Sequence, residues 1–157
     1  ALRRDTRRKA TLFVAKDGST IIGCAGVELD GAADDANLIP VLSNVATARE
    51  GRRRGVATTL VREAEKRVKE WGCTEMDLVV EESNKPARNL YSKLGYSVVS
   101  KDTASDTLVP TDDGRIAKQT TTTLTMRRDL NGGGAALLPI AGAAVVALGG
   151  FAYLNLF

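Results

Sequence analysis

Histidine is absent from the 157-residue sequence, and aromatic residues make up only 4% of it. The first absence excludes histidine-based acid–base catalysis, histidine metal ligands and pH sensing through an imidazole. Few aromatics provide few stacking platforms for single-stranded nucleic acid, and a net charge of +3 is too small to indicate a basic binding face. The two cysteines, Cys24 and Cys73, form no CxxC pair. We therefore expect no metal centre and no nucleic-acid partner.

The length and the apolar patterning predict one α+β domain with a single core. Apolar runs bounded by turn residues predict strands at residues 11–15, 20–29, 38–47, 75–81, 96–100 and 120–126. An apolar stripe at helical spacing predicts a long helix over residues 54–71, which Gly72 ends. A second, short helix is expected between Asn84, as its N-cap, and Gly95.

A cluster of arginines stands where the long helix is expected to begin. Four arginines fall within residues 49–54, in the stretch REGRRR. Cations at a helix N-terminus oppose the helix dipole, so they indicate that an anion binds among them. Free backbone amides at the helix start, a close approach at Gly55 and the small Ala57 favour a phosphate group. Taken alone, the cluster could instead be a solvated basic turn or an RNA contact.

Two stretches of the chain resemble the GCN5-related N-acetyltransferase (GNAT) superfamily. The first matches its acetyl-CoA signature Q/R-x-x-G-x-G/A at Arg52, Gly55 and Ala57. The second matches its element N-x-x-A-x-x-L-Y-x-x-x-G-F/Y at Asn84, Ala87, Leu90, Tyr91, Gly95 and Tyr96. The resemblance covers roughly residues 10–128. The stretches SNVATARE and VKEWGCTEMDLVV look like those of the plastid members found in plants and algae. It implies a mixed, mostly antiparallel sheet flanked by helices, with acetyl-CoA as the substrate.

The resemblance also implies roles for individual residues. The strand segment that contains Val45 and Thr47 would offer backbone groups to the pantetheine arm. The diphosphate would be held by backbone amides and by arginine side chains, from Arg52, Arg53, Arg54, Gly55, Val56, Ala57 and Thr58. Asn84 would contact the cofactor from the second helix, and Tyr91 would protonate the departing CoA thiolate.

The acceptor side of the reaction is less well specified. A lysine amine has a free pKa near 10.4, so a base or an ordered water must remove a proton before it attacks. Some family members carry a glutamate at the position of Val79, and here Glu81 and Glu28 are the carboxylates that remain. Family members also begin with a strand and two helices that build the acceptor pocket. Only about ten residues precede the first expected strand, so we expect that this section either lies outside this chain or has been lost, and in the second case the acceptor would have little to bind.

The C-terminal run at residues 135–157 has 23 residues and no charge. As a helix it would extend roughly 34 Å, enough to cross a hydrocarbon core of about 30 Å. We therefore predict a basic segment at residues 1–10, an acetyl-CoA-binding domain at 11–130, a glycine linker at 131–134 and a transmembrane helix at 135–157. Arg127 and Arg128 before the linker place the domain on the stromal or cytosolic side.

Two functions of different class follow from these expectations. The first is a membrane-anchored N-acetyltransferase that acts on lysine side chains or protein N-termini. The second is a GNAT-fold accessory subunit of a membrane complex, with little or no catalysis. The small residues of the tail favour contact with other transmembrane subunits. The similarity to plastid members suggests a thylakoid photosynthetic complex.

Overall fold

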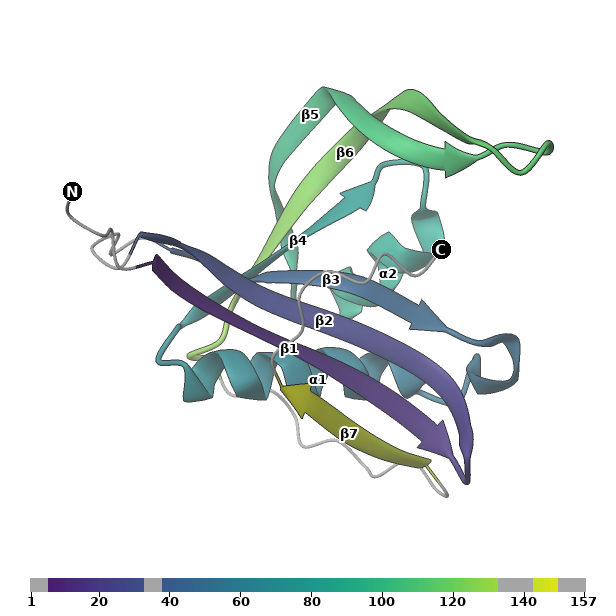
Figure 1. Ribbon diagram of the computed structural model, residues 1–157. Helices are drawn as coiled ribbons and strands as arrows, with labels where there is room; N and C mark the ends of the chain where they lie inside the picture. Colours follow the sequence, from purple (N-terminus) through teal and green to yellow (C-terminus); the bar gives the residue numbers. More distant parts are fainter. Residues whose placement is uncertain (1–5, 33–37, 133–142, 150–157) are drawn as a thin grey trace. The chain divides into compact units, whose positions relative to one another are not determined.

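The computed structural model describes residues 6–32, 38–132 and 143–149 (Figure 1). The chain divides into two compact units, one formed by Ala1–Asp77 with Asp129–Phe157 and the other by Leu78–Arg128. The strand β4 (Glu75–Glu81) runs through the boundary and contributes to both units. The expected diphosphate-binding residues therefore belong to the first unit, whereas Asn84 and Tyr91 belong to the second.

An antiparallel hairpin forms the centre of the first unit. Its strands, β1 (Thr6–Asp17) and β2 (Thr20–Ala32), pair along their whole length. The other edge of β2 pairs with β3 (Val41–Thr47), and the other edge of β1 pairs with β7 (Ala143–Gly149). The strand order is β3-β2-β1-β7, and the start of β4 lies beside β3. The pairings of β1 with β2, of β1 with β7 and of β2 with β3 are all antiparallel.

One face of these strands is covered by the helix α1 (Val56–Glu70), which packs against β1, β2 and β3 (Figure 1). The helix buries an apolar stripe at helical spacing, made of Val56, Leu60, Val61, Ala64 and Val68. It ends at Gly72, whose φ of 84° is left-handed. The amides of Gly72 and Cys73 bond back to Lys69 O and Val68 O at 2.9 and 3.1 Å, the Schellman arrangement.

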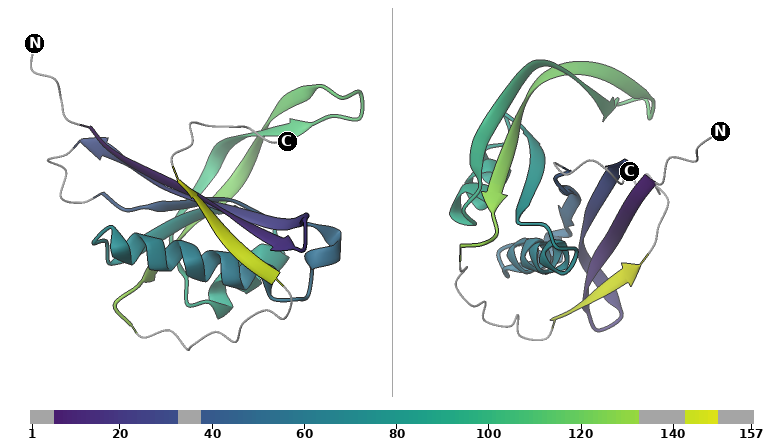
Figure 2. Two further views of the ribbon diagram at one scale, coloured as in Figure 1. Left: turned by 60° about the horizontal axis from the view of Figure 1, so that its bottom comes forward. Right: turned by 90° about the vertical axis from the view of Figure 1, so that its left-hand side faces the viewer.

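The second unit contains the rest of β4, the helix α2 (Lys85–Lys93) and a hairpin of β5 (Ser97–Pro110) and β6 (Ile116–Asp129). Its strand order is β5-β6-β4. The hairpin strands are 14 residues each, and Figure 2 shows them curving along their length. The buried side chains of this unit include Leu78, Val80, Leu94, Leu124 and Met126.

The expected elements agree best with the structure where the local pattern is strongest. The strand expected at residues 75–81 is β4, and the long helix begins and ends within two residues of its expected bounds. Other strands are longer than expected. β1 begins at Thr6, inside the segment 1–10, and residues 101–110 and 116–119, expected as loop, belong to β5 and β6. These extensions are mostly polar, and their apolar Leu108 and Ile116 are exposed, so cross-strand pairing rather than an apolar pattern specifies them.

The prediction of a transmembrane helix over residues 135–157 is wrong for residues 143–149, the part of that run that the structure describes. Residues 143–149 form the strand β7, which pairs in register with residues 11–17 of β1. A short apolar run rich in alanine and valine is compatible with a helix or a buried strand, and here the open edge of β1 decides. Residues 133–142 and 150–157 lie outside the described residues. Within the described part of the chain, no helix has the length and apolar character of a membrane span.

Candidate functional site

The strand β3 carries a bulge just before its end. Cys24 of β2 is opposite Ala46, and Gly26 is opposite Ser43. Two residues of β3, Asn44 and Val45, therefore face the single residue 25 of β2. Asn44 has a φ of 52°, and its carbonyl accepts a hydrogen bond from Cys24 Sγ at 3.5 Å. A bulge interrupts the ladder and frees backbone groups to point elsewhere. This is the segment expected to meet the pantetheine arm. The expectation rested on Val45 and Thr47 and missed the bulge.

Two glycines keep the segment between β3 and α1 close to β2. Ala48 N donates to Ile22 O over 2.9 Å, and a Cβ on Gly51 would lie 2.8 Å from the same oxygen. A Cβ on Gly23 would lie 2.8 Å from Val56 Cγ1 at the start of α1. Real Cβ atoms do not approach so closely, so the first turn of α1 can rest on β2 only because both positions are glycine. Sequence analysis missed them because close approach is a property of the packed elements.

Residues 52–55, which we call the arginine loop, turn the chain into α1. Arg53 has a φ of 61° and Gly55 a φ of 78°, so two of the four residues are left-handed. The conformation of Arg53 costs about 1–2 kcal/mol, whereas glycine adopts it freely. Alternation of this kind directs successive amides to one side and forms an anion-binding concavity.

The first amides of α1 add to this concavity. The opening residues Val56, Ala57 and Thr58 have no acceptor inside the helix, because the first such bond in the helix is Thr59 N to Gly55 O at 3.0 Å. Gly55 is the N-cap and supplies no side-chain acceptor, and the first turn contains no acidic residue. The helix start is thus positive and uncapped, as an anion site requires.

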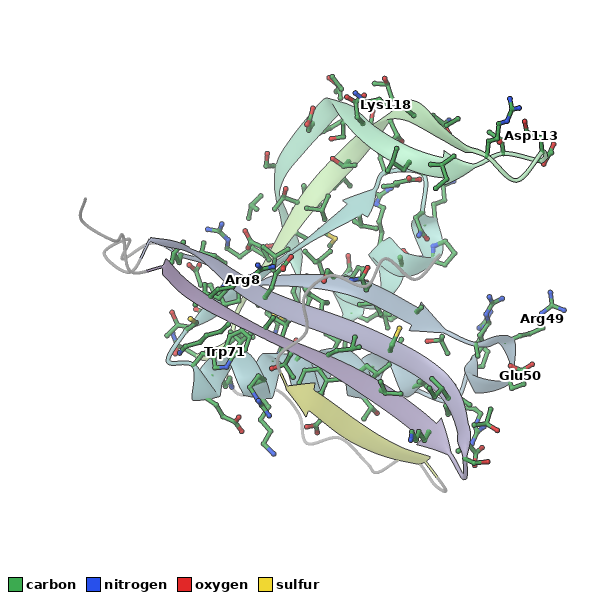
Figure 3. The ribbon with its side chains drawn as sticks, in the orientation of Figure 1. Arg8, Arg49, Glu50, Trp71, Asp113 and Lys118 are labelled. Carbon is green, nitrogen blue, oxygen red and sulfur yellow. The ribbon has the colours of Figure 1, made fainter. Side chains whose placement is uncertain are left out.

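The arginine side chains of the loop are not equivalent. Arg54 is bound to Asp17, with Nη2 and Oδ2 2.8 Å apart, and its Nη1 lies 3.5 Å from Glu50 O. Arg52 and Arg53 are exposed, and among the described residues neither has a recorded ion pair or hydrogen bond from its side chain. Figure 3 shows Arg49 and Glu50 pointing outward from the same end of the first unit. Of the three guanidinium groups expected to bind phosphate, those of Arg52 and Arg53 are therefore available for an anion, whereas that of Arg54 is paired with Asp17.

Asn84 is the N-cap of α2, as expected. Its Oδ1 accepts a hydrogen bond from Ala87 N at 3.2 Å, and Pro86 follows within the first turn. The side-chain carbonyl is thereby committed to holding the helix start. The expected cofactor contact of Asn84 stays a prediction.

Tyr91 lies near the end of α2 and is 8% exposed. Its carbonyl accepts from Tyr96 N at 3.0 Å, while Gly95 N donates to Ser92 O at 3.1 Å, which completes a second Schellman ending. The rings of Tyr91 and Tyr96 meet edge to face at 6.0 Å. Burial raises the pKa of the Tyr91 phenol above its ordinary value of 10.0. The phenol therefore holds its proton throughout the neutral range.

Comparison with known proteins decides the family. A sequence profile of the Acetyltransferase (GNAT) family matches residues 2–96. The chain belongs to the GNAT family. The N-alpha-acetyltransferase of Sulfurisphaera tokodaii is 31% identical over 98 residues, which are 58% of this chain and 59% of that protein. The chain thus spans about three-fifths of the length of this relative.

Solved structures show the same fold as the GNAT chain. The structure of Arabidopsis thaliana NAA60 in complex with acetyl-CoA has a TM-score of 0.65 and 18% identity, over 79% of this chain and 78% of that one. The NatC complex bound to Gag peptide and CoA has a TM-score of 0.61 and 20% identity, over 76% and 70%. The resemblance inferred from the two motifs is thereby confirmed at the level of family and fold.

Val79, which we expected at the position of a glutamate in some family members, is an exposed valine. Val79 is 57% exposed on β4. Glu81, two residues along the strand, accepts a hydrogen bond from Ser83 Oγ at 3.3 Å. Glu28 is in β2, opposite Ala10 and Val41 in the adjoining ladders. Within the described ranges, no group of three or more side chains is arranged to hold a metal ion. The structure thus offers no carboxylate at the Val79 position.

Proposed function

We propose that this chain transfers the acetyl group of acetyl-CoA to an amine. The observation that carries the proposal is the uncapped start of α1 behind the left-handed arginine loop, because it offers adjacent free amides with no acidic residue in the first turn. A diphosphate matches such a concavity in charge and in hydrogen-bonding capacity. The match to the GNAT profile and the acetyl-CoA complex of the NAA60 structure support the same ligand.

The arginine loop, the start of α1 and the end of β3 each have a place in this binding scheme. The amides of Val56, Ala57 and Thr58 would hold the diphosphate, and Arg52 and Arg53 would add charge-assisted hydrogen bonds. The bulged end of β3 would bond to the amides of the pantetheine arm in the manner of an added strand.

The acceptor we propose is the α-amino group of a protein or peptide. An α-amine has a pKa of about 7.7–8.0, so roughly a tenth of it is neutral at pH 7, whereas only about one lysine side chain in 2,500 is neutral. An enzyme without a strong base can use the first amine far more readily. The exposed Val79 at the glutamate position and the absence of histidine favour this choice. The curated relative is itself named an N-alpha-acetyltransferase.

The reaction forms a C–N bond and breaks the C–S bond of the thioester. The neutral amine attacks the thioester carbonyl, and the amine proton passes to water. The sulfur leaves as a thiolate and must gain a proton. We assign that proton to the Tyr91 phenol, which burial keeps protonated, and water then returns a proton to the phenolate.

The decisive experiment is an acetylation assay on the 157-residue chain with acetyl-CoA labelled in the acetyl group. One peptide has a free α-amine and no lysine, and its matched control has a blocked N-terminus and one lysine. Mass spectrometry should find acetyl on the first peptide and little on the second. Acetylation of lysine alone would refute the acceptor assignment, and binding of acetyl-CoA without turnover would favour the accessory-subunit alternative. The plastid location and the membrane partner stay predictions.

A further inference from the structure

The ion pair between Asp17 and Arg54 joins the arginine loop to the tip of the β1–β2 hairpin. The two residues are 37 positions apart in sequence, and Oδ2 and Nη2 lie 2.8 Å apart. Their side chains are 43% and 36% exposed. We call this contact the hairpin–loop ion pair.

The hairpin side of this contact is held on both flanks. Asp17 is opposite Thr20 in the ladder with β2, and it is opposite Ala143 in the ladder with β7. The backbone that carries the Asp17 carboxylate is therefore fixed on both sides. The short turn at Gly18, with a φ of 58°, closes the hairpin directly after it.

On the loop side, backbone bonds hold only the two ends: Arg52 N donates to Arg49 O over 3.3 Å, and Gly55 O accepts from Thr59 N over 3.0 Å. Residues 52–55 are exposed, and a Cβ placed on Gly55 would meet nothing within 4 Å. Arg53 is held in a left-handed conformation that its side chain disfavours. Of the three arginine side chains in the loop, only Arg54 has a recorded polar contact within the described part of the chain.

From these observations we infer that Asp17 is a positioning residue for the phosphate-binding loop and acts through Arg54. The hairpin–loop ion pair holds the left-handed loop in the form whose amides face the anion, and it directs the Arg54 guanidinium away from the phosphate. Arg52 and Arg53 then supply the side-chain charge. This inference rests on the proposed function, because it assigns Asp17 to the same CoA site.

A competing role for the same contact predicts the opposite change in CoA affinity. If Arg54 bound phosphate directly and Asp17 merely competed with it, removing the carboxylate would strengthen CoA binding. If Asp17 positions the loop, removing the carboxylate weakens binding. The sign of one measurement therefore separates the two roles.

The test is isothermal titration of the full chain with CoA, using Asp17→Asn, Arg54→Gln and the double variant. Each single variant should weaken CoA binding by about two- to fivefold, the range expected for one exposed ion pair. The double variant should be no weaker than either single variant, because both remove the same contact. Asp17→Glu, which keeps the charge, should restore most of the affinity.

Asp106→Asn is the matched control. Asp106 pairs with Lys118 over 2.6 Å and is similarly exposed at 48%, but it lies in the β5–β6 hairpin of the second unit. Its loss should leave CoA binding unchanged. Thermal unfolding of every variant shows whether a change in affinity reflects loss of fold.

The outcomes separate the inference from the function on which it rests. A wild-type chain that binds no CoA overturns the proposed function and this inference together. A wild-type chain that binds CoA, with Asp17→Asn equal or tighter, overturns only the positioning role. Effects of the two single variants that multiply in the double variant also overturn it, because independent residues behave in that way.

Discussion

Replacing Gly55 with alanine separates the stability of the arginine loop from its ability to bind phosphate. Gly55 has a φ of 78°, and a Cβ there would meet nothing within 4 Å. The stability change is therefore backbone strain of about 1–2 kcal/mol. Alanine also reduces the freedom of the unfolded chain, which offsets about 0.4–1 kcal/mol. We expect a net loss of about 1 kcal/mol and a melting temperature lower by roughly 2–4 °C.

The effect on binding should be larger than the effect on stability. Relief of strain at residue 55 rotates the peptide plane that leads into Val56, and at least one amide then turns away from the anion. A hydrogen bond to a charged group is worth about 1.5–3 kcal/mol, so CoA affinity should fall by about ten- to a hundredfold. Titration calorimetry measures this loss, and circular dichroism follows the melting temperature.

Gly114 supplies the control for this comparison. Its φ is 77°, and a Cβ there would also meet nothing within 4 Å, but it lies in the turn between β5 and β6. Gly114→Ala should lose a similar amount of stability and bind CoA as the wild type does. If Gly55→Ala is destabilised to the same extent and keeps wild-type affinity, the diphosphate does not bind at the arginine loop.

Three further substitutions test other parts of the structure. Leu60→Ala, at a fully buried position of α1, should lower the free energy of unfolding by about 2–5 kcal/mol in urea denaturation. Tyr91→Phe keeps the ring contact with Tyr96 and removes the proton, so kcat should fall about a hundredfold while KM for acetyl-CoA stays unchanged. Because the pKa of Tyr91 is raised above 10.0, its protonated form persists to higher pH. The wild-type kcat should therefore rise only as the acceptor amine loses its proton near pH 8. A fall in kcat between about pH 8 and 10 would contradict the role of Tyr91 as the acid. Asn84→Ala should cost about 1 kcal/mol of stability, and an unchanged melting temperature would contradict the cap.

The parts of the fold that could be predicted are those specified by local sequence. β4 alternates buried and less buried residues along EMDLVVE, and α2 begins at a capping asparagine followed by proline. Both helices end at a glycine with positive φ, Gly72 and Gly95, which the sequence also indicates. The helix caps and endings join residues at most five positions apart, and β4 is indicated by the alternation within its own seven residues.

The parts that could not be predicted depend on partners distant in sequence. β7 is a strand because residues 11–17 of β1 leave an edge open, and nothing within the apolar run itself distinguishes that outcome from a helix. The distal halves of β5 and β6 are polar and pair mainly with each other. Gly23 matters because Val56 lies against it after folding. Such features are settled by packing rather than by propensity.

The arginines at the start of α1 depend both on local sequence and on a partner that is distant in sequence. Their repulsion from the helix dipole is evident from the sequence and predicts an anion among them. The structure shows in addition that Asp17 pairs with Arg54, which reduces the local repulsion without placing a carboxylate in the first turn of the helix. An acidic residue in that turn would stabilise the helix but would compete with the phosphate for the same amides. Placing the balancing charge on a neighbouring hairpin keeps those amides free for the diphosphate that we propose they bind.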